Sequence, residues 1–220
     1  MNGILLIDKP AGWTSSDVVA KLRGILREKR IGHSGTLDPM ATGLLVVFVG
    51  RATRAVEFAE AADKTYEAGF RPGIVTDTQD ITGNVLSQRI PEFTGEQLSA
   101  ALDHFTGEQE QIPPMYSAIK VKGRKLYEIA RCGGTVERKP RQITVFSFQP
   151  AGRDGDDYRF LIHCSKGTYI RTLCHDLGEY LGCGGCMSSL RRISAGNGIH
   201  PLEIRQKHDR ASRPDPPGRL

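Results

Sequence analysis

The chain has 220 residues, of which 39% are hydrophobic and 25% charged, and its formal charge at neutral pH is +5. This length allows one sizeable hydrophobic core, and no apolar run approaches the roughly 20 residues that a membrane span requires. The start of the chain lacks the layout of a secretory signal, so we expect a cytoplasmic protein. The surplus of lysine and arginine favours a polyanion such as nucleic acid as partner.

The first third of the chain predicts two strands and two helices. Residues 3–7 are typical of a short buried strand. Ser16 or Asp17 can cap a helix whose apolar residues share one face, namely Val18, Val19, Leu22, Ile25 and Leu26. Residues 44–49 form an unbroken apolar run, which predicts a strand buried on both faces. Residues 51–62 are expected to be helical.

The rest of the chain continues this mixture of elements. Thr94 and Gln97 have the spacing of a capping box, and Leu98, Ala101, Leu102 and Phe105 follow at helical spacing. Residues 143–148 and 158–164 alternate as strands do, and residues 168–181 predict a helix that Thr168 can cap. Because regular βαβ spacing is missing, the pattern predicts an α+β fold with a mixed sheet.

Residues 32–45 concentrate chemical groups in one glycine-punctuated turn between two apolar runs. Glycine permits backbone angles closed to other residues, and Pro39 restricts the backbone directly after Asp38. A lone carboxylate on such a stiff bend has two interpretations. It is a nucleophile, or it caps its own turn.

Several blocks of the sequence resemble the TruB family of tRNA pseudouridine synthases. The turn GHSGTLDP at residues 32–39 resembles the family's signature for the loop that carries its catalytic aspartate. The other matching blocks are Lys9-Pro10, Lys64 with Tyr66, TDTQD at 76–80, QIPPMYSAIK at 111–120, SKGTYIR at 165–171 and Leu190-Arg191-Arg192. They occur in the family's order, and the resemblance covers residues 3–194.

The resemblance implies a fold and an activity. The fold is the pseudouridine synthase fold, a bent, mainly antiparallel mixed sheet with flanking helices and a central active-site cleft. The activity is the isomerisation of uridine to pseudouridine at position 55, in the T-loop of tRNA, without a cofactor. The partner is then the T-stem loop of tRNA, reached by flipping the target base out of its stack. We expect a monomer with no obligatory protein partner.

The resemblance also assigns roles to single residues. Asp38 becomes the nucleophile, Arg171 the cation that pairs with it, and Tyr66 the aromatic side chain that stacks on the uracil. As a base, Tyr66 would require a shifted pKa, because a phenol ordinarily titrates near pH 10. Taken without the resemblance, Arg171 is an ordinary surface ion-pair residue and Tyr66 a core aromatic residue.

Further residues are expected to bind the RNA. His33 is placed to fill the space that flipped bases leave, Tyr169 and Leu190 to line the pocket, and Asp80 to contact the flipped nucleotides. Backbone phosphates are expected to contact a set of basic residues: Lys9, Lys64, Lys120, Lys122, Arg124 and Lys125. The run KVKGRK at 120–125 is equally typical of a solvated hairpin turn.

We expect residues 1–198 to form the catalytic domain, with residues 74–92 as a mobile insertion that contacts RNA. Residues 199–220 are rich in proline and basic residues, so they predict a disordered tail. The resemblance implies a small C-terminal PUA domain at this point, and we expect this chain to lack it. The cysteines predict free thiols, and Cys183 with Cys186 lacks a second ligand pair for zinc, so no metal is expected.

Two other functions fit the same residues. One is a guide-RNA-dependent relative, a branch that shares the GHSGTLDP block. The other is a protein that binds or remodels RNA in the same cleft without catalysis. A phosphohydrolase is disfavoured, because no phosphate-binding GxxxxGK[ST] motif is present.

Overall fold

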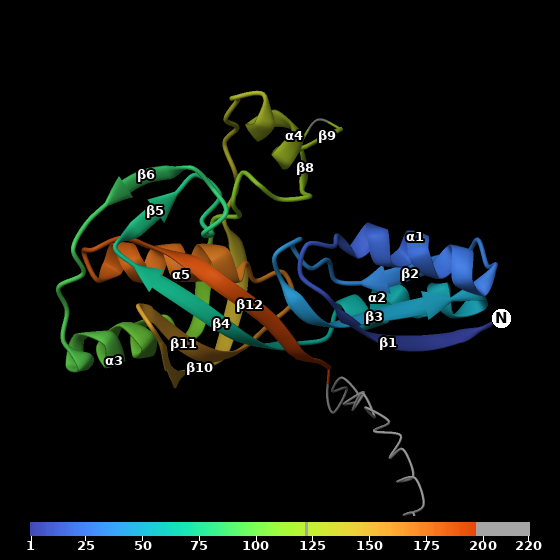
Figure 1. Ribbon diagram of the computed structural model, residues 1–220, viewed down its shortest axis with the longest axis horizontal. Coiled ribbons are helices and arrows are strands. Elements are labelled where there is room, and N and C mark those ends of the chain that lie inside the picture. Colours follow the sequence, from blue (N-terminus) through green and yellow to red (C-terminus); the bar gives the residue numbers. More distant parts are fainter. Residues whose placement is uncertain (122, 197–220) are drawn as a thin grey trace, which may run out of the picture.

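The computed structural model describes residues 1–121 and 123–196. The predicted tail at 199–220 and Lys122 lie outside the described residues. Within the described part, eight strands form one mixed sheet (Figure 1), in the order β1-β3-β12-β4-β11-β10-β7 with β2 also paired to β3. The α+β class and the mainly antiparallel mixed sheet are therefore confirmed. None of the helices in these residues is long and apolar enough to cross a bilayer.

The elements divide into two groups along the chain. The first group is β1 (Gly3–Lys9), α1 (Ser15–Leu26), β2 (Ile31–Ser34), β3 (Thr42–Val49), the 3-10 helix η1 (Gly50–Ala55) and α2 (Val56–Glu60). The second group is β4 (Lys64–Pro72), β5 (Ile74–Thr76), β6 (Val85–Gln88), α3 (Gly95–His104), β7 (Gly107–Gln111), β8 (Lys120–Val121), β9 (Arg124–Lys125), α4 (Leu126–Arg131), β10 (Arg141–Asp154), β11 (Asp157–Cys164), α5 (Ile170–Tyr180) and β12 (Gly185–Ala195). The groups occupy opposite ends of the molecule (Figure 1).

Strand β3 is buried on both faces, as its apolar run predicts. Val18 and Val19 of α1 pack with Leu45, Val47 and Val49 on one face. On the opposite face, the apolar residues of η1 and α2 pack with Leu44, Val46 and Phe48. Strand β3 is thus the centre of the first group.

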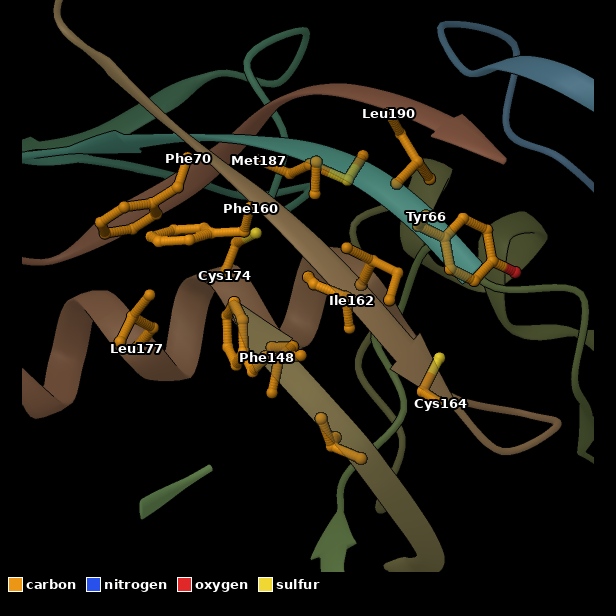
Figure 2. Close-up of a cluster of buried hydrophobic side chains, with 14 of the residues drawn as sticks. Tyr66, Phe70, Phe148, Phe160, Ile162, Cys164, Cys174, Leu177, Met187 and Leu190 are labelled. Carbon is orange, nitrogen blue, oxygen red and sulfur yellow. The ribbon is translucent and has the colours of Figure 1, made fainter. Parts of the chain in front are cut away.

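The second group is built around α5. Leu173, Cys174 and Leu177 on this helix are buried against aromatic and aliphatic side chains of the sheet, as Figure 2 shows for Phe160 and Phe148. Helix α3 adds Leu98, Ala101 and Leu102 to the same core. The predicted capping box of Thr94 and Gln97 is present.

Three local predictions are corrected. Helix α1 is capped by Thr14, whose side chain exchanges hydrogen bonds with Asp17, so Asp17 is the third residue of the helix and not its cap. Thr168 does not cap α5; its hydroxyl donates to the carbonyl of Ser165 and the helix begins at Ile170. Residues 51–62 form a 3-10 turn followed by a short α-helix rather than one helix.

The two groups meet at a narrow junction in the sheet. Strand β12 runs parallel to β3, but only Arg191 and Arg192 pair with it, opposite Thr42 and Gly43. The same edge of β3 pairs with β2 further along, from Val46 to Val49, because β1 follows the other edge over its whole length. The segment that connects β2 to β3 therefore lies where the edge of β3 passes from its pairing with β12 to its pairing with β2.

Candidate active site

The turn that carries Asp38 connects β2 to β3 and is held from several sides. The Leu37 side chain is buried in the main core, and its backbone N–H donates to the hydroxyl of Ser15 over 2.9 Å. The Pro39 carbonyl accepts from the backbone N–H of Gly12 over 2.8 Å. Asp38 stands between these two anchors with its side chain 35% exposed. The carboxylate is thus fixed at its base and accessible at its tip.

Arg171, in the first turn of α5, grips this carboxylate with two hydrogen bonds. Its Nε lies 2.9 Å from Oδ2 of Asp38, and its Nη2 lies 3.3 Å from Oδ1. The remaining donors bond the carbonyls of Thr78 and Tyr116 at 2.9 and 2.8 Å. The Arg171 side chain is 6% exposed. This geometry rejects the surface-pair interpretation, because a buried guanidinium held by four hydrogen bonds, two of them to one carboxylate, is fixed in orientation.

A second carboxylate faces the same guanidinium. Oδ2 of Asp80 lies 3.8 Å from Nε of Arg171, and Oδ1 of Asp80 accepts from the hydroxyls of Thr78 and Thr82. Asp80 is 6% exposed. The expected contact between Asp80 and flipped nucleotides would therefore require these bonds to open. In this structure Asp80 holds Arg171 instead.

Tyr66 lies on β4 and is 8% exposed. Figure 2 shows it with Leu190 at one end of the core cluster, and its hydroxyl is directed away from the other labelled side chains. Burial raises the pKa of the Tyr66 phenol, while the nearby charge of Arg192 opposes that rise. The phenol is therefore a poor base here, and the burial of the ring in the main core agrees with the interpretation of Tyr66 as a core aromatic residue.

Lys9 and Lys64 do not present charge on the surface where phosphate contacts were expected. Lys9 is 0% exposed, and its ammonium donates to the carbonyls of Pro10, Trp13 and Pro39. Lys64 is 6% exposed and donates to the carbonyls of Glu60 and Ala62. Burial lowers the pKa of both lysines. Both support the backbone around the site rather than reach outward.

His33 and Tyr169 border the site. The Nδ1 atom of the His33 ring is buried and has no hydrogen-bond partner among the described residues. Burial lowers the pKa of His33, with the charge of Arg192 adding to the effect, so the ring is neutral at pH 7. Tyr169 precedes α5, and its backbone N–H and carbonyl both bond the amide of Gln111. The Leu190 side chain packs in the main core.

The basic run that follows Tyr116 forms a small hairpin, as one of the two interpretations of its sequence expected. Strands β8 and β9 pair Lys120 with Lys125 and Val121 with Arg124. Two backbone bonds tie the hairpin to the segment beside the site, from Tyr127 to Ser117 and from Leu126 to Ile119. Lys120 and Arg124 are exposed.

Several contributors to the site had no signal in the sequence. The carbonyls of Thr78 and Tyr116, which orient Arg171, are backbone groups that every residue carries. Gln111 and Thr82 stand in or near matching blocks, but only the fold shows what they bond. Among the described residues, no group of three or more His, Cys, Asp or Glu side chains could hold a metal.

The insertion at 74–92 contributes the base of the site. Its strands β5 and β6 form a separate two-stranded sheet. The turn between them docks on β12 through backbone bonds that join Met187 to Gln79 and Ile81. Thr76 and Asp80 are buried, while Val85, Leu86 and Ile90 are exposed. The segment thus has a fixed base and an exposed outer part.

Comparison with known proteins places the chain in a family. The model "TruB family pseudouridylate synthase (N terminal domain)" matches residues 23–170, and "tRNA pseudouridylate synthase B C-terminal domain" matches residues 171–204. tRNA pseudouridine synthase B of Opitutus terrae is 52% identical over 88% of this chain and 81% of its own length. The same enzyme of Clostridium kluyveri is 48% identical over 90% of this chain and 68% of its own.

Solved structures agree with this placement. A crystal structure of a Cbf5-Nop10-Gar1 complex contains a chain with a TM-score of 0.72 and 31% identity to this one, matched over 91% of this chain and 50% of that chain. A structure of an H/ACA RNP bound to a substrate RNA containing 2'-deoxyuridine gives a TM-score of 0.67 at 29% identity. On the match of its sequence and of its fold, the chain belongs to the TruB family of pseudouridylate synthases.

Proposed function

We propose that the protein isomerises uridine to pseudouridine in tRNA, at position 55 of the T-loop, without a cofactor and without a guide RNA. The observation that carries the proposal is the Asp38–Arg171 pair, with a buried guanidinium and a partly exposed carboxylate whose Nε and Oδ2 are 2.9 Å apart, in a chain 52% identical to a tRNA pseudouridine synthase B. The guide-dependent alternative has weaker support, because the matched chain of the Cbf5 complex is 31% identical, against 52% for the tRNA pseudouridine synthase B.

The reaction requires four bond changes and a rotation of the base. The bond from ribose C1′ to N1 breaks, the uracil turns, and a bond forms between C1′ and C5, which then loses its proton while N1 gains one. A carboxylate assists by attacking the nucleoside or by stabilising the positive charge that develops on the ribose. Asp38 suits this role because its side chain stays 35% exposed while Arg171 orients its two carboxylate oxygens.

The target uridine must leave its stack to reach Asp38. Flipping a base costs a few kcal/mol, and an inserted side chain that stacks on the bases left behind offsets part of this cost. His33 fits such a role because its neutral ring carries no charge that would oppose stacking. Tyr66 is proposed to stack on the flipped uracil, with Tyr169 and Leu190 closing the pocket around it.

We propose that residues 1–198 act as the catalytic unit, with the outer part of 74–92 as a mobile segment that closes over RNA. The exposed Lys120 and Arg124 supply phosphate contacts beside the site. The tail at 199–220 adds sequence-independent affinity through its basic residues. No protein partner is required, and the protein acts as a monomer in the cytoplasm.

The test uses a tRNA transcript that carries no modification. The purified protein is incubated with this tRNA and no guide RNA, and pseudouridine is mapped by chemical sequencing. Product at position 55 supports the proposal. Product only after a guide RNA is added selects the guide-dependent alternative. Tight binding without product selects an RNA-binding or RNA-remodelling protein.

A further inference from the structure

The guanidinium of Arg192 lies beneath the Asp38 turn and bonds both of its ends. The side chain is 1% exposed. Its Nη2 donates to the carbonyl of Gly35 over 3.0 Å, and its Nε donates to the carbonyl of Leu44 over 2.7 Å. Gly35 precedes Asp38 by three residues, and Leu44 follows it by six. One side chain therefore closes the whole turn.

The sheet explains why an arginine side chain is needed at this point. Leu44 lies on β3 between the residues that pair with β12 and those that pair with β2. A backbone carbonyl at such a gap has no strand to bond, and a buried carbonyl left unpaired is costly. The Arg192 side chain supplies the missing donor to the carbonyl of Leu44. The backbone between β2 and β12 is therefore paired although no strand lies there.

The backbone around Arg192 is adapted to the close approach. Gly43 has a φ of +95°, and a Cβ there would stand 2.3 Å from the carbonyl oxygen of Arg192. Gly35 has a φ of +76°, and a Cβ there would stand 3.2 Å from Nη1 of Arg192. Both glycines thus allow the turn to rest directly on Arg192.

Arg192 also faces Tyr66. The two residues are directly opposite in the antiparallel pair of β12 and β4, which places their side chains on the same face of the sheet. The ladder shifts its register immediately after Arg192, and such bulges redirect the neighbouring side chains. The same guanidinium therefore contacts the Asp38 turn and lies beside the aromatic residue of the site.

The charge of Arg192 is not balanced by an acid. Within residues 1–121 and 123–196, no carboxylate oxygen lies within 4 Å of its guanidinium in an ion pair. Burying an unpaired charge is expensive, and an apolar side chain would fill the same space at lower cost. Retaining a cation here indicates that its donors are needed where they bond.

We infer that Arg192 is a positioning residue. It acts through the backbone of the Asp38 turn and keeps the carboxylate in its reactive position beside Tyr66. This inference rests on the proposed function. Arg171 holds the carboxylate from α5, and Arg192 holds the turn beneath it from β12. Arg171 therefore restricts the side chain of Asp38, and Arg192 restricts its backbone turn.

The test compares Arg192→Gln and Arg192→Lys with Arg191→Gln. Arg191 is the preceding residue on β12 and has the same side chain, but it pairs with Asp8 on the surface, where it is 42% exposed. In Arg192→Gln we expect the single-turnover rate at saturating tRNA to fall about 100-fold, because a shift of about 1 Å in a reacting group has this effect. The tRNA Kd stays within about threefold, since Arg192 touches no substrate. Arg192→Lys recovers part of the rate, and Arg191→Gln behaves as wild type.

Amide hydrogen exchange gives a readout that does not depend on activity. In Arg192→Gln, the rate of amide exchange in residues 35–43 should rise about tenfold, while the rate in α3 stays unchanged. The reason is that the substitution promotes local unfolding of the turn and leaves the rest of the fold stable. An equal rise in α3 would indicate general destabilisation and overturn the inference, as would a nearly normal rate.

If Arg192→Gln does not fold, Arg192→Lys decides: wild-type rate and wild-type exchange in 35–43 would also overturn it. If the wild type forms no pseudouridine, the proposed function fails, and the exchange comparison still decides the role of Arg192.

Discussion

At the scale of single residues, the site is a set of buried cations around one accessible carboxylate. Arg171 is paired with Asp38 and Asp80, whereas Lys9 and Lys64 are bonded to neutral carbonyls. Such an arrangement of cations attracts negative charge, namely the Asp38 carboxylate and the phosphates of an RNA. Asp38 is the member of this set whose side chain is most open to substrate.

Asp38→Asn should abolish turnover while tRNA affinity stays within about tenfold, or ~1.4 kcal/mol. Asparagine has the same shape as aspartate, but it lacks the negative charge that the reaction needs. Single-turnover assays and filter binding measure the two quantities. Asp8→Asn, which removes an exposed carboxylate that pairs with Arg191, is the control and should turn over normally. Substantial turnover in Asp38→Asn would remove the nucleophile role.

His33 makes stability depend on pH in a known direction. Burial lowers the pKa of His33 from 6.5, so the unfolded chain binds this proton more tightly than the folded protein does. Its contribution to stability is therefore present above about pH 6.5 and is lost as the pH falls toward the folded pKa. We expect the free energy of unfolding to fall from pH 7 to pH 5, and to fall less in His33→Gln. Urea denaturation at both pH values measures this; an equal fall in both proteins would contradict it.

At the scale of elements, the junction of β3 with β12 determines where the site forms. It joins the two groups of the sheet through only two residue pairs, and it places the Asp38 turn, Tyr66 and Arg192 next to one another. The positive φ of Gly43 and the closeness of Arg192 to it leave no room for a side chain. The junction therefore depends on glycine at this position.

Gly43→Ala should lower the free energy of unfolding by roughly 2–5 kcal/mol, because it combines backbone strain with a clash against a backbone oxygen. Gly95→Ala is the matched control. Gly95 begins α3, and a Cβ there meets nothing within 4 Å, so this change should be neutral or slightly stabilising. Chemical denaturation of both variants checks the difference. Equal stability of the two variants would mean that the junction tolerates a side chain.

At the scale of the whole molecule, charge and shape together favour a long polyanionic partner. The formal charge is +5, and the exposed hairpin of β8 and β9 lies above the sheet near the segment that bonds Arg171 (Figure 1). Phosphate contacts release counterions, so their number sets the salt dependence of binding. The hairpin follows Tyr116, whose carbonyl bonds Arg171, and carries the exposed Lys120 and Arg124.

Replacing Lys120 and Arg124 with glutamine should reduce the slope of log K against log salt for tRNA by about 1.4–1.8, because each lost phosphate contact removes ~0.7–0.9. Binding titrations from low to moderate salt measure the slope. The control replaces Lys21 and Lys29, exposed residues in and just after α1, and should leave the slope nearly unchanged. If both pairs lower it equally, the hairpin makes no special contact.

Local signals in the sequence predicted most elements, whereas the candidate site residues came from the resemblance to a family. The apolar run of β3, the capping box of α3 and the alternation of β11 are local patterns, and they formed as expected because neighbouring residues determine them. The cap of α1 was misplaced because Thr14, Ser16 and Asp17 are all acceptable capping residues. Asp80 was expected to contact RNA. The structure instead shows its carboxylate beside the guanidinium of Arg171, inside the protein.

By itself, the sequence determined the α+β class and the position of the glycine turn that carries Asp38. The tertiary structure alone decided that Asp80 meets the same guanidinium as Asp38, that Lys9 and Lys64 are buried, and that Arg192 bonds the turn. The physical reason is distance along the chain. Arg171 and Arg192 reach the Asp38 turn from α5 and β12, and such contacts exist only once the sheet has joined its two groups.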